Sequence, residues 1–327
     1  MNRRNAITML GSASLGLLAT HMLSGKESET NFAQLLPKLS TESRERLLRV
    51  IRQPGFSGQI PATDVRALLA SGPTDIDALM LALLPLARTY SRPPISKYLV
   101  GTVAQGRDGG LYLGANLELA GHSLNFSVHG EQAAISNAYM HGDTGISAVA
   151  VTAAPCGHCR QFMNELTPGS DIRILIEGSP AVNLSALLPQ SFGPKDLGFS
   201  DGAFPVRESN LVLTKTQSDD LISAALSAAR KSYAPYTKSH SGVAVSARDR
   251  IFRGCYIENA AFNPSLPPLQ TALAALIIAG GDYSGITKVV LAEMEGAVIS
   301  QRDVTEAALA TIAPKAELRV IKSRLAA

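Results

Sequence analysis

The chain has 327 residues, which is too long for one simple core, so we expect two or more domains. Hydrophobic residues make up 46% and charged residues 17%, a balance typical of a globular protein and not of a disordered one. A net charge of +3 provides no broad basic surface for wrapping a nucleic acid, and the absence of Trp argues against a base-stacking platform.

The cysteines, Cys156, Cys159 and Cys255, are too few for a disulfide framework. Two of them form a Cys-x-x-Cys pair, which indicates metal or redox chemistry. Cys255 stands alone, and we expect it to be a small buried hydrophobic residue.

Residues 1–30 differ in composition from the rest of the chain. Arg3 and Arg4 precede an apolar run from Ala6 to Leu23, and a polar stretch follows. This layout resembles a twin-arginine secretory signal, although it lacks a clean cleavage site. The alternative is a loose N-terminal helix or a misassigned start codon, and the run is marginal in length for a membrane-spanning helix.

Residues 31–90 show helical periodicity, with leucines recurring three or four positions apart. Pro54-Gly55 and Gly72-Pro73 end two of the segments, and Asp75 or Asp77 is placed to cap the next helix. We therefore expect a small helical cap, followed by the first helix of a larger domain.

Residues 91–200 alternate between strand and helix patterns. The expected elements are strands 98–104 and 110–117 joined by a hairpin turn, a helix from His129 to Gly142, a buried strand 146–151 and a helix that begins at Cys156. Alternation of this kind predicts a layered α/β domain.

Residues 210–327 repeat this plan. Gly114-Ala115-Asn116-Leu117-Glu118 returns as Gly254-Cys255-Tyr256-Ile257-Glu258. Continuing the register with single-residue gaps places Pro268-Leu269-Gln270 opposite His129-Gly130-Glu131, and no cysteine falls where a second pair is required. The second copy is therefore predicted to keep the scaffold without the chemistry. The predicted segments are an extension 1–30, a helical cap 31–74, a catalytic domain 75–200 and a second domain 201–327.

The residues suited to catalysis lie at His-x-Glu and Pro-Cys-x-x-Cys. His129, Cys156 and Cys159 can hold one zinc per chain and leave its fourth position open, which is typical of a catalytic zinc. His129 and Cys156 are each expected at the start of a helix. The N-terminus of a helix favours a cysteine thiolate over the thiol. Glu131 lies close enough to His129 to carry protons at the open position. The combination is the known signature of zinc deaminases.

Other interpretations of the motif are weaker. A redox pair explains Cys-x-x-Cys but not His129 and Glu131. A structural zinc finger requires a fourth protein ligand, and the nearby candidate, His158, lies between the two cysteines. A non-catalytic zinc protein has no use for Glu131, and a deaminase of bases within RNA or DNA requires a basic groove.

From about Phe32 onward the chain resembles the dimeric two-domain cytidine deaminases. The residues that carry the resemblance are Val100-Gly101, Gly114–Glu118, His129–Gln132, Pro155–Leu166, Phe192–Leu197 and Glu258–Pro264. The resemblance implies an α/β/α layered domain duplicated in tandem. It implies a zinc-dependent hydrolase that converts cytidine and 2′-deoxycytidine into uridine and 2′-deoxyuridine plus ammonia, in pyrimidine salvage. A zinc-bound hydroxide is expected to attack C4, with Glu131 as the proton shuttle.

The resemblance also implies a homodimer. Its expected substrate is a free nucleoside, and no nucleic-acid partner and no stable membrane association are expected. It places the protein in the cytoplasm, with export through the N-terminal segment as the alternative. Ala261 and Phe262 match a segment that reaches the neighbouring subunit's site.

Six further residues match the family's substrate contacts. Asn116 and Glu118 match the grip on the ribose 3′-hydroxyl. Tyr98 and Phe192 match aromatic positions against the base, with tyrosine where phenylalanine is usual. Main-chain groups at Gly130 and Ala154 match contacts to the pyrimidine edge, although alanine and threonine are usual there.

Overall fold

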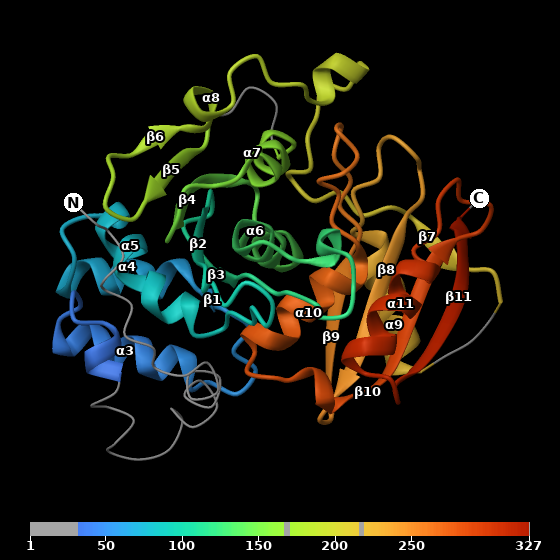
Figure 1. Ribbon diagram of the computed structural model, residues 1–327, viewed down its shortest axis with the longest axis horizontal. Helices are drawn as coiled ribbons and strands as arrows, with labels where there is room; N and C mark the ends of the chain where they lie inside the picture. Colours follow the sequence, from blue (N-terminus) through green and yellow to red (C-terminus); the bar gives the residue numbers. More distant parts are fainter. Residues whose placement is uncertain (1–31, 167–170, 216–218, 327) are drawn as a thin grey trace.

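The computed structural model describes residues 32–166, 171–215 and 219–326. The expected extension, residues 1–30, lies outside the described residues. Two sheets stand side by side, one from each half of the chain, with helices α6 and α10 between them (Figure 1). The predicted tandem α/β duplication is confirmed.

The first half builds a six-stranded sheet of order β1-β3-β2-β4-β5-β6, in which only β4 and β5 run parallel. Its elements are α3 (Thr41–Ile51), β1 (Gln59–Ile60), α4 (Ala62–Ser71), α5 (Ile76–Arg88), β2 (Gly101–Gly106), β3 (Leu111–Ala115), α6 (Gly130–His141), β4 (Ile146–Val151), α7 (Gly157–Asn164), β5 (Arg173–Ile176), β6 (Val182–Asn183) and α8 (Leu184–Leu187). Short 3₁₀ turns occupy Leu124–Phe126 and Pro194–Leu197.

The second half builds a five-stranded sheet of order β7-β11-β10-β8-β9, with β10 and β11 parallel. Its elements are β7 (Leu211–Leu213), α9 (Asp220–Arg230), β8 (Ser241–Ala247), β9 (Arg250–Cys255), α10 (Pro268–Ile278), a 3₁₀ turn (Tyr283–Gly285), β10 (Ile286–Met294), α11 (Arg302–Ile312) and β11 (Glu317–Leu325). The order β9-β8-β10-β11 repeats the order β3-β2-β4-β5, so the two halves share one topology.

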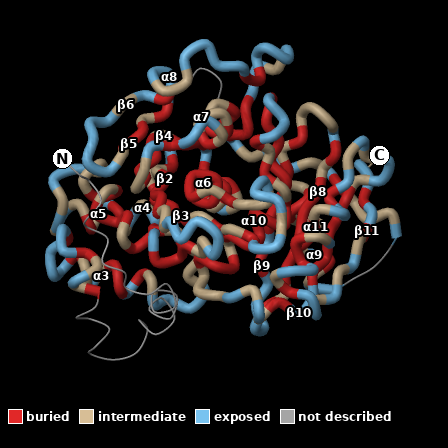
Figure 2. The backbone as a smooth tube through the Cα atoms, in the orientation of Figure 1, coloured by how far each residue is buried: buried red, intermediate tan, exposed pale blue. Residues whose placement is uncertain are grey.

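Helices α5 and α6 cover opposite faces of the first sheet. A side chain at Gly101 on β2 would meet the backbone of α5, whereas a side chain at Gly130, the first residue of α6, would meet the neighbouring Thr102. Adjacent strand residues point to opposite faces, so the sheet lies between the two helices. Helix α6 is buried along most of its length (Figure 2). It packs on the sheet and contacts α10 on its outer side.

The local signals explain most of the boundaries. The Asp75 side chain caps α5 by accepting from the Ala78 N–H at 2.8 Å. Gly142 ends α6 in the left-handed conformation, with φ of 79°. The predicted helix 129–142 and strand 146–151 are confirmed, as is the helix that begins at Cys156.

Two expected elements are wrong in part. Residues 31–90 are not wholly helical, because Gln59–Ile60 pair with β3 as an edge strand. The strand expected from Tyr98 begins only at Gly101, because Lys97 adopts a left-handed conformation and the Glu118 carboxylate holds the preceding backbone in a turn.

The register of the repeat also requires correction. A side chain at Gly114 would meet the Gly130 carbonyl at 2.5 Å, and one at Gly254 would meet the Pro268 carbonyl at 2.3 Å. Pro268 therefore matches Gly130 and not His129. The shift arises because the bridged pair Ile257–Leu266 encloses a shorter loop than the pair Leu117–Val128.

In the corrected register Pro267 matches His129, Leu269 matches Glu131 and Gln270 matches Gln132. The position of the proton carrier is thus occupied by a leucine.

Among the described residues, no single helix is long and apolar enough to span a membrane. Helices α4 and α5 satisfy that test only as a pair, which is bent by 103°. The apolar residues of α5 lie in the core.

Candidate active site

Three side chains with metal-binding atoms meet at the start of two helices. His129 is the N-cap residue of α6 and Cys156 is the N-cap residue of α7, with Cys159 in the first turn of α7. Their ligand atoms all lie within 4.8 Å of one another. Within the described part of the chain, no other such group of histidine, cysteine and carboxylate side chains occurs.

The spacing of these atoms fits zinc. Bonds of the usual length to sulfur and nitrogen in tetrahedral geometry place two sulfurs about 3.8 Å apart and a sulfur and a nitrogen about 3.6 Å apart. Cys156 Sγ lies 3.7 Å from Cys159 Sγ and 3.5 Å from His129 Nδ1. His158 is not part of the group, so the described residues supply three ligands and leave a fourth position open.

Local hydrogen bonding favours the thiolate, which is the ligand form, at Cys156 but not at Cys159. Hydrogen bonds with Cys159 and then His129 lower the pKa of Cys156 to about 3. The hydrogen bond with Cys156 and burial raise the pKa of Cys159, because two adjacent sulfurs compete for one proton. A divalent cation in the group takes the place of that shared proton.

The backbone of His129 is held by Gln132 in the first turn of α6. The His129 N–H donates to Gln132 Oε1 at 3.2 Å, which forms a capping box. The His129 ring stacks on the His158 ring, with centroids 5.0 Å apart. Burial and the neighbouring His129 lower the pKa of His158. The histidine ligand is therefore fixed from both its backbone and its ring.

Glu131 lies in the first turn of α6 and is only 4% exposed. Burial raises the pKa of its carboxyl, with a backbone hydrogen bond and the Cys159 thiol acting in the opposite direction. A buried carboxyl beside a metal group is placed to accept and return a proton.

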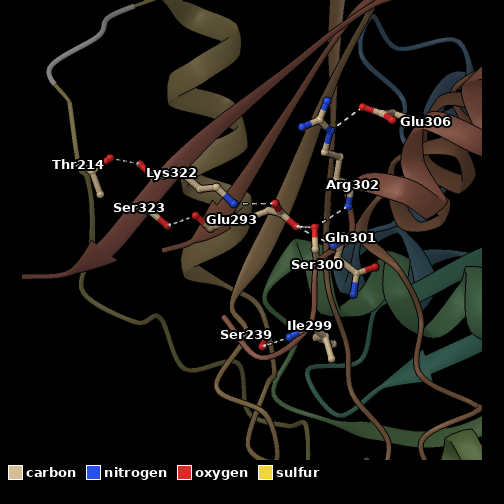
Figure 3. A network of polar contacts seen from close by, with 10 residues as sticks. All are labelled: Thr214, Ser239, Glu293, Ile299, Ser300, Gln301, Arg302, Glu306, Lys322 and Ser323. Carbon is tan, nitrogen blue, oxygen red and sulfur yellow. Dashed lines mark hydrogen bonds and ion pairs between the residues drawn. The ribbon is translucent and has the colours of Figure 1, made fainter. Parts of the chain in front are cut away.

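In the second domain, a polar network occupies the N-terminus of α11, the helix that corresponds to α7 (Figure 3). Glu293 on β10 accepts from Ser300 Oγ at 2.9 Å, from the Gln301 N–H at 2.6 Å and from Lys322 Nζ at 3.1 Å. Gln301 is the N-cap residue of α11, as Cys156 is of α7. The N-terminus of α7 carries the cysteines in the first domain. At the N-terminus of α11, its counterpart in the second domain, the Glu293 carboxylate accepts the Gln301 N–H instead.

Comparison with known proteins assigns the chain to a family. Residues 74–172 and residues 184–306 each match the profile of the cytidine and deoxycytidylate deaminase zinc-binding region. The cytidine deaminase of Serratia proteamaculans is 42% identical over 285 residues, which cover 87% of this chain and 95% of the relative. The cytidine deaminase of Salmonella dublin is 44% identical over 282 residues, covering 86% and 94%.

The chain belongs to the cytidine deaminase family. It is a hydrolase that deaminates cytidine and depends on zinc. The group His129, Cys156 and Cys159 lies within the first matched region, 74–172. The second matched region, 184–306, includes the corresponding position in the other half of the duplication, where Pro267 and Leu269 stand in place of ligand and proton carrier.

Asn116 and Glu118, expected to grip the ribose in this cytidine deaminase, follow β3 and hold the segment that carries Tyr98. Asn116 Nδ2 donates to the Tyr98 carbonyl at 2.9 Å, and Asn116 Oδ1 accepts from the Val100 N–H at 2.9 Å and from Ser91 Oγ. Glu118 Oε2 accepts from two backbone N–H groups, at Ile95 and Ser96.

Both side chains keep bonding capacity beyond these contacts. The amide of Asn116 has a second N–H, and Glu118 Oε1 accepts only from Ser96 Oγ. Tyr98 is 57% exposed. The structure therefore ties Asn116 and Glu118 to the segment that carries Tyr98.

Phe192 and Ala154 lie on segments joined to the cysteine-bearing helix. The Phe192 carbonyl accepts from Gln161 Nε2 at 2.8 Å and from Asn164 Nδ2 at 2.9 Å, both on α7. Ala154 is exposed and lies two residues before Cys156. Phe192 is 47% exposed, so its ring is free to contact a ligand.

Gly130 is required by its neighbour Thr102. A side chain at Gly130 would meet Thr102 Oγ1 at 2.5 Å, closer than real contacts allow. Thr102 is fully buried and its hydroxyl has no partner within the described structure. Threonine on β2 thus fills the space that a methyl group on α6 would take, which accounts for glycine at position 130.

Ala261 and Phe262 lie in the second domain, on a loop next to α7. Phe262 is 65% exposed and adopts φ of 61°, a left-handed conformation that is uncommon for an aromatic residue. Cys255, expected to be a small buried residue, is fully buried, and burial raises the pKa of its thiol to about 12.

Sequence reasoning missed three residues that shape the site. Gln132 lies inside a recognised motif and Thr102 directly follows one, and hydrophobic patterning carries no signal for what their side chains contact. Glu165 is the last residue but one of the Pro155–Leu166 motif and is fully buried, although a glutamate at the end of an amphipathic helix usually faces water. Only its position in the fold shows what it binds.

Proposed function

We propose that this cytidine deaminase acts on free cytidine and 2′-deoxycytidine, with Glu131 as the residue that carries the proton. The observation that supports the proposal is the buried Glu131 carboxyl in the helix turn that follows His129, beside the group His129, Cys156 and Cys159. A purely structural metal site has no need of such a carboxyl.

Bound zinc supplies a Lewis acid that lowers the pKa of water. The rest of the chemistry falls to the chain. Addition of water at C4 of the pyrimidine moves the C4=N3 electron pair to N3, which then needs a proton. Loss of the 4-amino group as ammonia needs another. Glu131 takes one proton from the water as its oxygen bonds to C4, and delivers that proton to N3. It then takes the proton of the new C4 hydroxyl and delivers it to the 4-amino group, which leaves as ammonia as the C4–N bond breaks and the C4=O bond forms, so the carboxyl ends each cycle as it began.

Recognition of the sugar is proposed for Asn116 and Glu118. Their free N–H and carboxylate oxygen suit a hydroxyl that both donates and accepts. Cytidine and 2′-deoxycytidine share the 3′-hydroxyl, so a grip on that group accepts both and rejects free cytosine. The exposed rings of Tyr98 and Phe192 are proposed to offer aromatic faces for the base.

The proposed unit of function is a homodimer. Tyr98, Phe192 and Phe262 are large apolar side chains that are 57%, 47% and 65% exposed. We infer that a second copy of the chain covers these exposed side chains. A second copy that places Ala261 and Phe262 against the site would bury them. We place the enzyme in the cytoplasm and in pyrimidine salvage, with export through residues 1–30 as the alternative.

The test is ammonia release from cytidine, 2′-deoxycytidine, free cytosine and a cytosine-containing oligonucleotide. We expect turnover of the two nucleosides only. Comparable turnover of the oligonucleotide would identify a nucleic-acid deaminase instead. Sedimentation velocity measures the dimer, and mass spectrometry of the mature N-terminus decides whether residues 1–30 are removed.

A further inference from the structure

One loop of the second domain is held by both helices that carry the zinc ligands. The loop is Asn259–Pro264, which includes Ala261 and Phe262. Gln132 on α6, whose Oε1 caps the His129 backbone, donates through Nε2 to the Pro264 carbonyl at 3.2 Å. The remaining contacts to the loop come from the end of α7.

Asn259 joins the loop to Gln161. Asn259 Nδ2 donates to the Gln161 carbonyl at 3.0 Å, and Asn259 Oδ1 accepts from Gln161 Nε2 at 3.3 Å. The same Oδ1 accepts from the Ala261 N–H at 3.0 Å. Asn259 is fully buried, so its amide has no water to replace these bonds.

Glu165 forms the centre of the contact. Its side chain is fully buried, and Oε1 accepts from Tyr233 Oη at 2.9 Å and from Tyr236 Oη at 2.5 Å. Oε2 accepts from the Ala260 N–H at 2.7 Å. Three neutral donors therefore satisfy the carboxylate, two from the segment before β8 and one from the loop.

Burial of the Glu165 carboxylate carries a cost in folding stability. A buried carboxylate loses its hydration, and Glu165 is also the C-cap residue of α7, where the helix dipole disfavours negative charge. No ion pair of Glu165 occurs among the described residues. Such groups are retained in some proteins because they select one arrangement, not because they add stability.

The loop lies toward the far end of α7 from the metal group. A helix rises about 1.5 Å per residue, so Glu165 lies about 14 Å along the axis from Cys156. Phe262 next to it is largely exposed, with its backbone in a strained left-handed conformation. A strained exposed aromatic residue persists when its surroundings hold it in place, and Glu165, Asn259 and Gln132 provide that hold.

We propose that Glu165 is a positioning residue that fixes the Asn259–Pro264 loop so that Ala261 and Phe262 complete the active site of the partner subunit. The proposal rests on the homodimer of the proposed function. Helices α6 and α7 thereby serve two sites. Their N-termini hold the metal ligands of their own chain, and their contacts to the loop shape the site of the other.

The first test is Glu165→Gln in the zinc-loaded enzyme. The amide keeps the size of the side chain but turns an NH₂ group toward the Ala260 N–H or toward the tyrosines, so the loop loses its anchor. We expect kcat/KM for cytidine to fall about tenfold, mainly through KM, with zinc content and sedimentation unchanged. Tyr236→Phe removes one donor and is expected to act in the same direction with a smaller effect.

The matched control is Glu293→Gln. Glu293 is also a buried carboxylate with three donors, but these lie at α11 and β11 (Figure 3). We expect it to lower the melting temperature while leaving KM unchanged. An equal rise of KM in both variants would show that Glu165 acts only through general stability and would overturn the proposal.

The second test separates action in trans from action within one chain. Differently tagged Glu165→Gln and Glu131→Gln chains are co-expressed, and the heterodimer is purified through both tags. Its working site uses Glu131 of the first chain and receives the loop of the second chain, whose Glu165 is intact. We expect the KM of the wild-type enzyme at about half its activity per dimer.

The alternatives give different results. A heterodimer that keeps the raised KM of the Glu165→Gln homodimer would place the effect within one chain and refute positioning of the partner's site. A wild-type enzyme that sediments as an active monomer would refute the homodimer itself. The two failures are therefore distinguishable.

Discussion

The two halves of the chain show which parts of this fold serve the scaffold and which serve the chemistry. Glu118 in the first half and Glu258 in the second make the same contacts, each accepting from two backbone N–H groups of a turn, the turn before β2 in the first half and the turn before β8 in the second. Lys97 and Lys238 adopt the same left-handed conformation in that turn. A glutamate at this position is therefore part of the scaffold in both halves.

Other positions differ between the halves and point to function. Asn116 is replaced by Tyr256, which is buried. His129 is replaced by Pro267 and Glu131 by Leu269, so the second half loses the ligand and the proton carrier at once. An asparagine that is absent from the silent copy is a stronger candidate for substrate contact than a glutamate that both copies keep.

Removal of a metal ligand should have the largest effect. In Cys156→Ala the group loses the thiolate that lies 3.5 Å from His129 Nδ1 and 3.7 Å from Cys159 Sγ, so we expect loss of zinc and of all deaminase activity. Metal analysis of the purified protein measures the first and ammonia release the second. Cys255→Ala is the control, because that buried cysteine lies in the second domain. Zinc retained at one per chain in Cys156→Ala would show that the ligand set is wrong.

Glu131→Gln should keep zinc and the fold while activity falls by about 10²- to 10⁴-fold, the usual contribution of general acid–base catalysis. The amide preserves shape but cannot take a proton. Leu269→Met, at the matching position of the second domain, conserves volume and should leave kcat within about twofold of the wild-type value. Steady-state kinetics and metal content test the pair, and wild-type turnover in Glu131→Gln would refute the mechanism.

Asn116→Ala should raise KM for cytidine by about tenfold or more, because the amide contacts both the sugar site and the segment that carries Tyr98. Tyr256→Phe, its counterpart in the second domain, should leave KM unchanged. Inhibition constants of free cytosine and of nucleosides separate the two roles. If Asn116→Ala no longer prefers nucleosides to free cytosine, the amide binds the sugar. An unchanged preference means that the amide only supports the segment that carries Tyr98.

Gly130→Ala should cost about 1–3 kcal/mol of unfolding free energy, because the added methyl group overlaps Thr102 Oγ1. The double variant with Thr102→Ala should recover most of that loss. Denaturant unfolding of both single variants and the double variant gives the coupling energy. Strict additivity of the two changes would contradict the steric pairing.

The smallest effect is expected for Gln270→Ala. In the corrected register this residue matches Gln132 and not the proton carrier, so kcat and KM should stay within about twofold of wild type. A collapse of activity with zinc retained would show that the second domain takes part in the chemistry.

The sequence by itself determined the chemistry and the plan of the fold. The ligands and the proton carrier lie within short motifs at helix starts, where the spacing along one chain already limits how the side chains meet. The duplication was readable because Gly114 and Gly254 recur where a strand packs against a helix backbone, and Glu118 and Glu258 recur where a turn needs an acceptor for its N–H groups. The helix 129–142 and the strand 146–151 were readable because their periodicity and end signals agree.

Only the tertiary structure decided how the halves fit together. The residue that matches His129 depends on a loop whose length differs between the two halves. The close contacts of Gly114 and Gly254 with the helix backbones fixed that match. The pairing of Thr102 with Gly130 and the burial of Glu165 against Tyr233 and Tyr236 join residues far apart in the chain. Such contacts follow from packing between elements, which no local pattern of residues encodes.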